Sequence, residues 1–205
     1  MQLRRFNAHP LDEKRVMKLF TADAYIARVS LIDLDALWDA GIRCLLLDRD
    51  NTCVSRKTKQ MPDDILAWIR KAQAAGFSIC LVSNNFFSRD VAHTAQLLGV
   101  HKIDHAMKPA PWALHKAMHH VGVAKNEVVL IGDQVFTDVV AGKFAGISTI
   151  LVRPLSVTDL FYTKLFRIVE HRILRSVHFE GETSPEGETS PEGETSPEGE
   201  TSPEE

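Results

Sequence analysis

The sequence predicts an α/β protein built on a doubly wound parallel sheet. Three observations support this fold class. Short apolar runs alternate with helical segments along residues 33–152, glycines end most of the helical segments, and polar residues directly follow four of the apolar runs. Strands that alternate with helices in this way form a parallel sheet with helices on both faces. The length of 205 residues fits one main domain of this kind.

The first helix and strand of the sheet are predicted over residues 33–40 and 43–48. Apolar residues follow Leu34 at the i, i+3 and i+4 positions of a helix, and Gly41 provides a helix stop. The next residues form a short apolar run that ends abruptly in carboxylates, as expected for a buried strand. The sheet therefore begins before residue 50.

The rest of the sheet repeats the same order of strand and helix. Predicted helices cover residues 62–75, 88–98 and 111–121, with one more after Asp133 that ends at Gly146. Predicted strands cover residues 77–82, 103–107, 128–131 and 147–152. Prolines that open two of these helices and glycines that close them set the boundaries.

The two ends of the chain differ from this central domain, which is predicted over residues 21–178. Residues 1–20 are interpreted as an N-terminal extension with a short helix after Pro10. An amphipathic helix is predicted over residues 158–178, with a basic stripe formed by Lys164, Arg167, His171, Arg175 and His178. A solvent-facing side of a helix docked on the sheet explains the same stripe. Residues 179–205 carry four copies of Gly-Glu-Thr-Ser-Pro-Glu and are predicted to be a disordered acidic tail.

Charge is divided unevenly along the chain. Residues 180–205 hold ten acidic residues and no basic residue, so residues 1–179 have 24 basic against 17 acidic residues, a net charge of +7. A basic body suits an anionic substrate or an anionic surface. Cysteines without metal-type spacing fit a reducing compartment, and no apolar run reaches the length of about 18 residues that a membrane span needs. We expect a cytoplasmic protein without a cleaved signal peptide.

Two carboxylates one residue apart follow the strand at 43–48. Side chains alternate along a strand, so Asp48 and Asp50 are expected on one side, about 6–7 Å apart, with Arg49 on the other. Carboxylates this close repel each other unless one is protonated or a hard cation such as Mg²⁺ joins them. A turn rich in Asp, Asn and Thr explains the same residues without any site.

Polar residues at four strand ends indicate one shared site. Asp48 and Asp50, Ser83, Lys108 and Asp133 each follow a predicted strand, and ligands bind outside the carboxyl ends of strands in open sheets of this class. Hydrolysis of a phosphate monoester needs a nucleophile in line, cations around the transferred group and an acid for the leaving oxygen. These side chains supply all three, because a carboxylate can attack phosphorus and a lysine can stabilise the phosphate oxygens.

The motifs resemble those of the haloacid dehalogenase superfamily: Asp-x-Asp-x-Thr, a strand-end Ser, a Lys, and Gly-Asp-x-x-x-x-Asp occur here in order. The resemblance implies that Asp48 is the nucleophile and Asp50 the general acid and base. It implies phosphate binding by Ser83, Asn84 and Lys108. It also implies a Mg²⁺ cofactor held by Asp48, Asp50 and Asp133, with Thr52 and Asp138 in support.

A narrower resemblance, over about residues 20–175, is to the YqeG-type branch of this superfamily, which is related to phosphatidylglycerophosphate phosphatases. It is carried by the stretches DRDNT, VSNN, KP and IGDQVFTDVVAGKFAG. Two residues depart from the branch: Arg49 stands where an apolar residue is usual, and Cys53 where Leu or Val is usual. Both flank the nucleophile, so the resemblance implies reduced activity as one outcome.

Motif spacing bears on the substrate. Asp50 and Ser83 lie 33 residues apart, and Ser83 and Lys108 lie 25 apart, which leaves no room for a cap domain. An open site favours a large or surface-bound phosphomonoester, and the basic stripe favours contact with an anionic membrane. The expected function is Mg²⁺-dependent hydrolysis of phosphatidylglycerophosphate to phosphatidylglycerol, at the inner face of the membrane. The alternatives are a soluble, protein or nucleic-acid phosphate, with nucleic acid least favoured, or a weakly active regulatory or binding protein.

Overall fold

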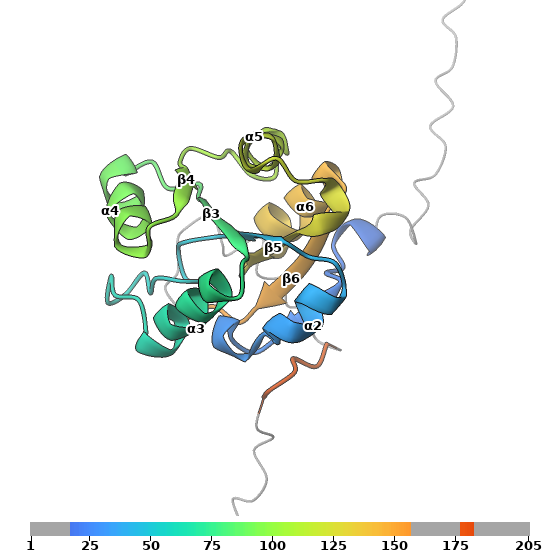
Figure 1. Cartoon of the computed structure of the whole chain (residues 1–205), viewed down its shortest axis with the longest axis horizontal. Coiled ribbons are helices and arrows are strands. Elements are labelled where there is room, and N and C mark those ends of the chain that lie inside the picture. Colours follow the sequence, from blue (N-terminus) through green and yellow to red (C-terminus); the bar gives the residue numbers. More distant parts are fainter. Residues whose placement is uncertain (1–16, 157–176, 183–205) are drawn as a thin grey trace, which may run out of the picture.

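A six-stranded parallel sheet with helices on both faces forms the centre of the molecule (Figure 1). The structure is a computed structural model that describes residues 17–156 and 177–182. The strands lie in the order β1-β6-β5-β2-β3-β4 and every neighbouring pair is parallel. Their bounds are β1 Ala24–Ile26, β2 Cys44–Leu47, β3 Ser78–Val82, β4 His101–Ile103, β5 Val128–Gly132 and β6 Ser148–Val152. The predicted α/β fold class is confirmed.

Three helices of ten or more residues and several short ones connect the strands in the described part of the chain. Their bounds are η1 Val29–Leu31, α2 Leu34–Asp39, α3 Asp63–Ala74, α4 Ser88–Leu98, α5 Trp112–Val121, η2 Lys125–Glu127, the π-helical turn η3 Val135–Val139 and α6 Val140–Ala145. The predicted helices at 33–40, 62–75, 88–98 and 111–121 are confirmed within one or two residues at each end.

Alternate residues of β2 enter two separate hydrophobic cores. Leu45 and Leu47 pack in the core that contains Ile69 of α3. Leu46 lies in the other core, with Leu114 of α5. Because β2 is covered on both faces, it is apolar throughout, which is why its sequence shows a continuous apolar run without alternation.

Two strands differ from prediction. The strand expected at residues 103–107 ends at Ile103, because His105 and Met107 adopt left-handed backbone conformations (φ 51° and 53°) that a strand cannot contain. Strand β1 at the sheet edge was not predicted, since its three residues are too few for a period-two pattern to show.

Residues 177–182 cross the boundary predicted at residue 178 between the C-terminal helix and the tail. Residues 177–182 are neither helical nor detached: Phe179 is buried against the ring of Tyr25, and Glu180 exchanges backbone hydrogen bonds with the end of β1. Burial of one aromatic side chain within an acidic segment accounts for the difference. We therefore extend the proposed domain from 178 to Glu182. The remainder of the predicted helix and tail, and residues 1–16 of the N-terminal extension, lie outside the described residues.

No helix within residues 17–156 or 177–182 is both long and apolar enough to cross a membrane.

The strand order creates a switch point between β2 and β5. From β2 the chain proceeds to β3 and β4 on one side, and then returns to place β5 on the other side of β2. At such a point the loops after the two neighbouring strands diverge and leave a crevice at their carboxyl ends. Only residues 48–62 separate β2 from α3, and only residues 83–87 separate β3 from α4, so neither described connection contains a cap domain.

Candidate active site

Asp48 lies at the switch point, directly after β2. Its backbone N–H donates to the carbonyl of Ile131 in β5 (2.9 Å), which extends the ladder by one residue. The ammonium of Lys108 donates to Asp48 Oδ1 (2.7 Å) and to Asp138 Oδ1 (2.6 Å). Asp48 Oδ2 is buried and accepts no hydrogen bond from any described residue. One oxygen of this carboxylate is therefore fixed, and the other remains available for chemistry.

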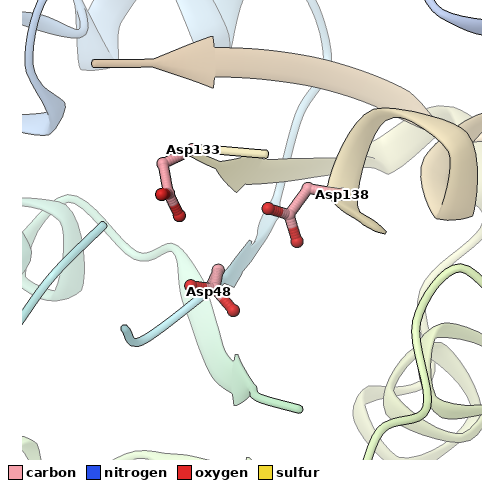
Figure 2. Close-up of side chains that lie close together, drawn as sticks. All are labelled: Asp48, Asp133 and Asp138. Carbon is pink, nitrogen blue, oxygen red and sulfur yellow. The ribbon is translucent and has the colours of Figure 1, made fainter. Parts of the chain in front are cut away.

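Three carboxylates from separate elements converge here, as Figure 2 shows. Asp48 follows β2, Asp133 follows β5 and Asp138 belongs to η3; each contributes an oxygen within 4.8 Å of the others. Thr52 donates to Asp133 Oδ1 (2.9 Å), and the backbone N–H of Gln134 donates to Asp138 Oδ2 (3.1 Å). The cluster is thus held in place by the sheet and by local hydrogen bonds.

Gly132 makes the position of Asp138 possible. A Cβ atom on this glycine would lie 2.3 Å from Asp138 Cγ, well inside van der Waals contact. The carboxylate of Asp138 therefore rests directly on the backbone at the end of β5. The glycine of the Gly-Asp pair in the sequence motif thus has a steric reason at this site.

Burial and mutual repulsion shift the pKa values of this cluster. Burial raises the pKa of Asp48 to about 6; the charge of Lys108 opposes this shift and that of Asp138 adds to it. Burial is the main cause that raises the pKa of Asp133 well above its ordinary value, and the charges of Asp48 and Asp138 add to it. The hydrogen bond from Thr52 and the charge of Arg56 lower this pKa by a smaller amount. Burial lowers the pKa of Lys108, but the charges of Asp138 and Asp48 outweigh it and raise the value overall.

The donor set fits a hard divalent cation. Three converging carboxylates supply the oxygen ligands that Mg²⁺ prefers. A bound cation would also offset the repulsion that adds to burial in raising the pKa values of Asp48 and Asp133. The residues that could hold it are Asp48, Asp133 and Asp138.

The side-chain oxygens of Asp50, which was predicted among the metal ligands, do not belong to this cluster. Its Oδ1 accepts from Arg49 Nη1 (2.5 Å) and its Oδ2 accepts from Asn85 Nδ2 (3.0 Å). Asp138, predicted only to support the site, takes its place in the cluster. The reason is that β2 ends at Leu47, so the alternation expected of a strand does not continue to residue 50.

Strand alternation predicted that the side chain of Arg49 points away from the site, but the structure places it beside Asp50. Its guanidinium is buried, donating from Nε to Thr94 Oγ1 of α4 (2.9 Å) and from Nη1 to Asp50. The second departure, Cys53, is fully buried in the core beside Leu47, and burial raises the pKa of its thiol, so it remains neutral. Neither residue leaves an unpaired charge next to Asp48.

The predicted phosphate-binding residues occupy the same edge of the sheet. Ser83 is buried after β3, and its hydroxyl accepts from the backbone N–H of Asn85 (3.0 Å). The side chain of Asn84 exchanges two hydrogen bonds with the backbone of Lys108 (2.8 and 2.9 Å). Asn84 therefore positions Lys108. Asn85, which sequence reasoning did not select, contacts Asp50 instead, and only its place beside Asn84 could have suggested it.

Comparison with known proteins adds independent findings. A family model described as HAD-hydrolase-like matches residues 105–154. The chain is 32% identical over 164 residues to the Probable phosphatase YqeG of Bacillus subtilis (strain 168), covering 80% of this chain and 95% of that protein. It is 26% identical over 153 residues to phosphatidylglycerophosphate phosphatase 1, chloroplastic/mitochondrial, of Arabidopsis thaliana, covering 70% of this chain and 44% of that protein.

Among solved structures, the cobalt-bound deoxy-D-mannose-octulosonate 8-phosphate phosphatase of Haemophilus influenzae aligns with a TM-score of 0.46 at 16% identity. The alignment covers 66% of this chain and 89% of that one.

Proposed function

We propose that this chain hydrolyses phosphatidylglycerophosphate through an aspartyl-phosphate on Asp48. The premise is that the chain belongs to the haloacid dehalogenase-like phosphatases, and within them to the family of YqeG. The observation that carries the proposal is the asymmetry of the Asp48 carboxylate. One oxygen is held by Lys108, while the other is buried, has no hydrogen-bond partner among residues 17–156 and 177–182, and is adjacent to the acidic pair Asp133 and Asp138. A nucleophile must combine a fixed orientation with a free lone pair, and Asp48 has both.

The first half of the proposed reaction transfers the phosphoryl group to the protein. Asp48 Oδ2 attacks phosphorus while the bond from phosphorus to the leaving oxygen breaks. Asp50 gives a proton to that leaving oxygen, and the ammonium of Lys108 stabilises the charge on the equatorial oxygens. Mg²⁺, held by Asp48, Asp133 and Asp138, would supply positive charge against the repulsion between carboxylate and phosphate.

The second half returns the protein to its starting state. Asp50 takes a proton from water as the water oxygen attacks phosphorus, the bond to Asp48 breaks, and inorganic phosphate leaves. Arg49 and Asn85 each occupy one lone pair of the Asp50 oxygens, so they orient this carboxylate while leaving further lone pairs for the proton transfers. Ser83 and Asn84 act in support, by fixing the loop after β3 and the backbone of Lys108.

The lipid substrate is proposed from the relatives and from charge. The Arabidopsis relative is named for phosphatidylglycerophosphate, and residues 1–179 of this chain carry a net charge of +7. We place the protein at an anionic membrane surface, reached from the cytoplasm. The segment 158–178 adds the basic residues Lys164, Arg167, Arg172 and Arg175, which lie outside the described residues. Each cation near an anionic membrane contributes about 1 kcal/mol to the attraction between protein and membrane.

Phosphate release from a panel of substrates tests this function. With Mg²⁺ present, we expect kcat/KM for phosphatidylglycerophosphate in mixed micelles to exceed that for glycerol 3-phosphate, a phosphopeptide and a 5′-phosphorylated oligonucleotide by at least about 100-fold. The soluble glycerol phosphate is the matched control, because it has the same phosphomonoester without the lipid. Comparable values for the lipid and any soluble compound would contradict the lipid assignment while leaving the phosphatase chemistry intact.

Metal dependence gives a prediction with a readout besides activity. Mg²⁺ should raise the melting temperature of the full chain, because it binds the folded carboxylate cluster and not the unfolded chain. Asp133→Asn should remove this shift. The metal-free variant should itself melt no lower than the parent, since it loses one of three mutually repelling charges. Differential scanning calorimetry with and without chelator measures both effects.

Asp35→Asn, at an exposed helix position, is the control and should keep the full Mg²⁺ shift. A Mg²⁺ shift of normal size in Asp133→Asn would refute the assignment of this residue to the metal. Ca²⁺ should stabilise the fold without supporting turnover, because its longer bonds misplace the nucleophile.

A further inference from the structure

Exposed apolar side chains gather at the edge of the sheet that carries the candidate active site. Among the described residues, the four large apolar side chains with the greatest exposure are Trp112 (76%), Phe86 (75%), Phe87 (74%) and Met107 (71%). All four lie in the loops that follow β3 and β4 or at the start of α5. Other exposed apolar residues, such as Leu97 and Phe144, are less accessible and lie late in helices. We refer to Phe86, Phe87, Met107 and Trp112 as the apolar rim.

The apolar rim is joined to the catalytic groups. Phe86 follows Asn85, whose side chain contacts Asp50, and Met107 precedes Lys108, whose ammonium contacts Asp48. The two loops are bound together by the paired hydrogen bonds between Asn84 and the Lys108 backbone. The rings of Phe86 and His105 also pack at 5.2 Å between centroids. The loops that carry Phe86 and Met107 therefore form one surface next to the catalytic groups.

The backbone holds part of this rim outward. Met107 is in a left-handed conformation (φ 53°), which an L-residue with a side chain adopts at an energetic cost, and its side chain remains exposed. Single exposed apolar residues are ordinary on protein surfaces, but a group of four at one edge marks an interaction surface. The connections at this edge, residues 48–62 and 83–87, contain no cap domain.

Charge around the rim indicates an anionic partner. The loop after Asp50 carries the sequence Arg56-Lys57-Thr58-Lys59, in which the two lysines are exposed, and the charge of Arg56 acts on Asp133. Arg89 is exposed at the start of α4, two residues after Phe87. Exposed aromatic residues interspersed with lysine and arginine are typical of surfaces that enter the headgroup region of a bilayer.

We propose that the apolar rim inserts into the surface of an anionic lipid bilayer, so that the site opens directly onto phosphomonoester headgroups. The inference rests on the proposed function for its substrate, but the docking itself needs no catalysis. Side chains of an interfacial segment reach about 5–10 Å into the boundary between headgroups and acyl chains. Because the rim lies in the loops at the carboxyl edge of the sheet, its insertion would turn that edge, and Asp48 with it, toward the lipid phosphates without extracting the lipid.

Sedimentation with vesicles made of equal parts phosphatidylglycerol and phosphatidylcholine tests the docking. Phe86→Ser combined with Phe87→Ser should lower the partition coefficient of the full chain by at least about tenfold, because two buried aromatic side chains are lost from the lipid-bound state. Leu97→Ser combined with Phe144→Ser is the matched control. Both of these residues lie near the C-terminal ends of their helices, at the opposite edge of the sheet, and their replacement should leave partitioning unchanged.

Tryptophan fluorescence supplies a second readout at the rim. Trp112 is the most exposed tryptophan, whereas Trp38 is about half as exposed (37%) and Trp68 is buried (6%). Addition of the same vesicles should shift the emission to shorter wavelength, and Trp112→Phe should remove the shift while preserving binding. Circular dichroism and melting temperature confirm that each variant is folded.

The outcomes separate this inference from the proposed function, because phosphatidylglycerol carries no phosphomonoester. Unchanged vesicle binding by the Phe86 and Phe87 double variant would overturn the docking surface, even if phosphatidylglycerophosphate proves to be the substrate. Loss of vesicle binding would uphold it, even if the lipid is not hydrolysed. A change in oligomeric state on size-exclusion chromatography, with vesicle binding retained, would instead assign the rim to a protein interface and overturn the proposal.

Discussion

Replacing Asp48 by Asn should lower kcat for phosphomonoester hydrolysis by at least about 10⁴-fold, because it removes the nucleophilic lone pair and its charge together. The fold should remain intact. The amide has nearly the volume of the carboxylate, and Lys108 keeps its second partner, Asp138, at 2.6 Å. The residual rate of Asp48→Asn distinguishes two mechanisms. A reaction through an aspartyl-phosphate loses its nucleophile, whereas direct attack by water on phosphorus would need the Asp48 carboxylate only for orientation and would lose less of its rate.

A single-turnover assay with a soluble aryl phosphate measures the effect independently of any membrane. Asp39→Asn, an exposed aspartate at the end of α2, serves as the matched control and should retain parental turnover. If Asp48→Asn retained turnover within about tenfold of the parent, covalent catalysis by Asp48 would have to be abandoned.

The second large effect concerns stability. Lys108→Met should lower the free energy of unfolding by about 3–5 kcal/mol, since it removes the ammonium that pairs with two buried carboxylates. For a domain of this size the loss corresponds to a fall in melting temperature of roughly 10 °C. Lys116→Met, at an exposed position of α5, is the control and should change the melting temperature little. Adding Asp138→Asn to Lys108→Met should recover part of the loss, because one uncompensated charge disappears.

The deficit of Lys108→Met should shrink as the pH falls toward about 6, the pKa of Asp48 in the parent, and should change little below that pH. The sign follows from protonation: burial raises the folded-state pKa of Asp48 above its unfolded value, so the folded state binds more protons and gains stability as the pH decreases. Removing Lys108 raises this pKa further. If Lys108→Met melted within about 2 °C of the parent at neutral pH, the ion pairs of Lys108 would not compensate the negative charges of the carboxylate cluster.

The convergence of Asp48, Lys108 and Asp133 could be predicted because it depends on one property of parallel sheets. All strands point the same way, so residues that follow strands meet at one edge even when 85 positions of sequence separate Asp48 from Asp133. The apolar runs of β2, β3 and β5 are visible in the sequence because these strands are buried on both faces.

Contacts that depend on where a long side chain turns could not be predicted. Arg49 reaches Thr94, which is 45 residues away on α4, and it also pairs with Asp50, whose carboxylate lies outside the cluster. Neither fact follows from strand alternation, because the strand has already ended. Phe179 was missed for a different reason: one aromatic residue beside an acidic repeat has no periodicity, and only the exposed edge of β1 determines that it is buried.

The order of strands also constrains how the protein folds. β2 pairs with β3 after a connection of about 30 residues, but it pairs with β5 only after about 80, so the β2–β5 contact carries the larger loop-closure entropy and is expected to form later. Asp133 and Asp138 reach Asp48 only in that step. The electrostatic repulsion of the three carboxylates is therefore absent from any intermediate built on β2, β3 and β4. A divalent cation that binds the completed cluster would stabilise the native state selectively and slow its unfolding more than it speeds its folding.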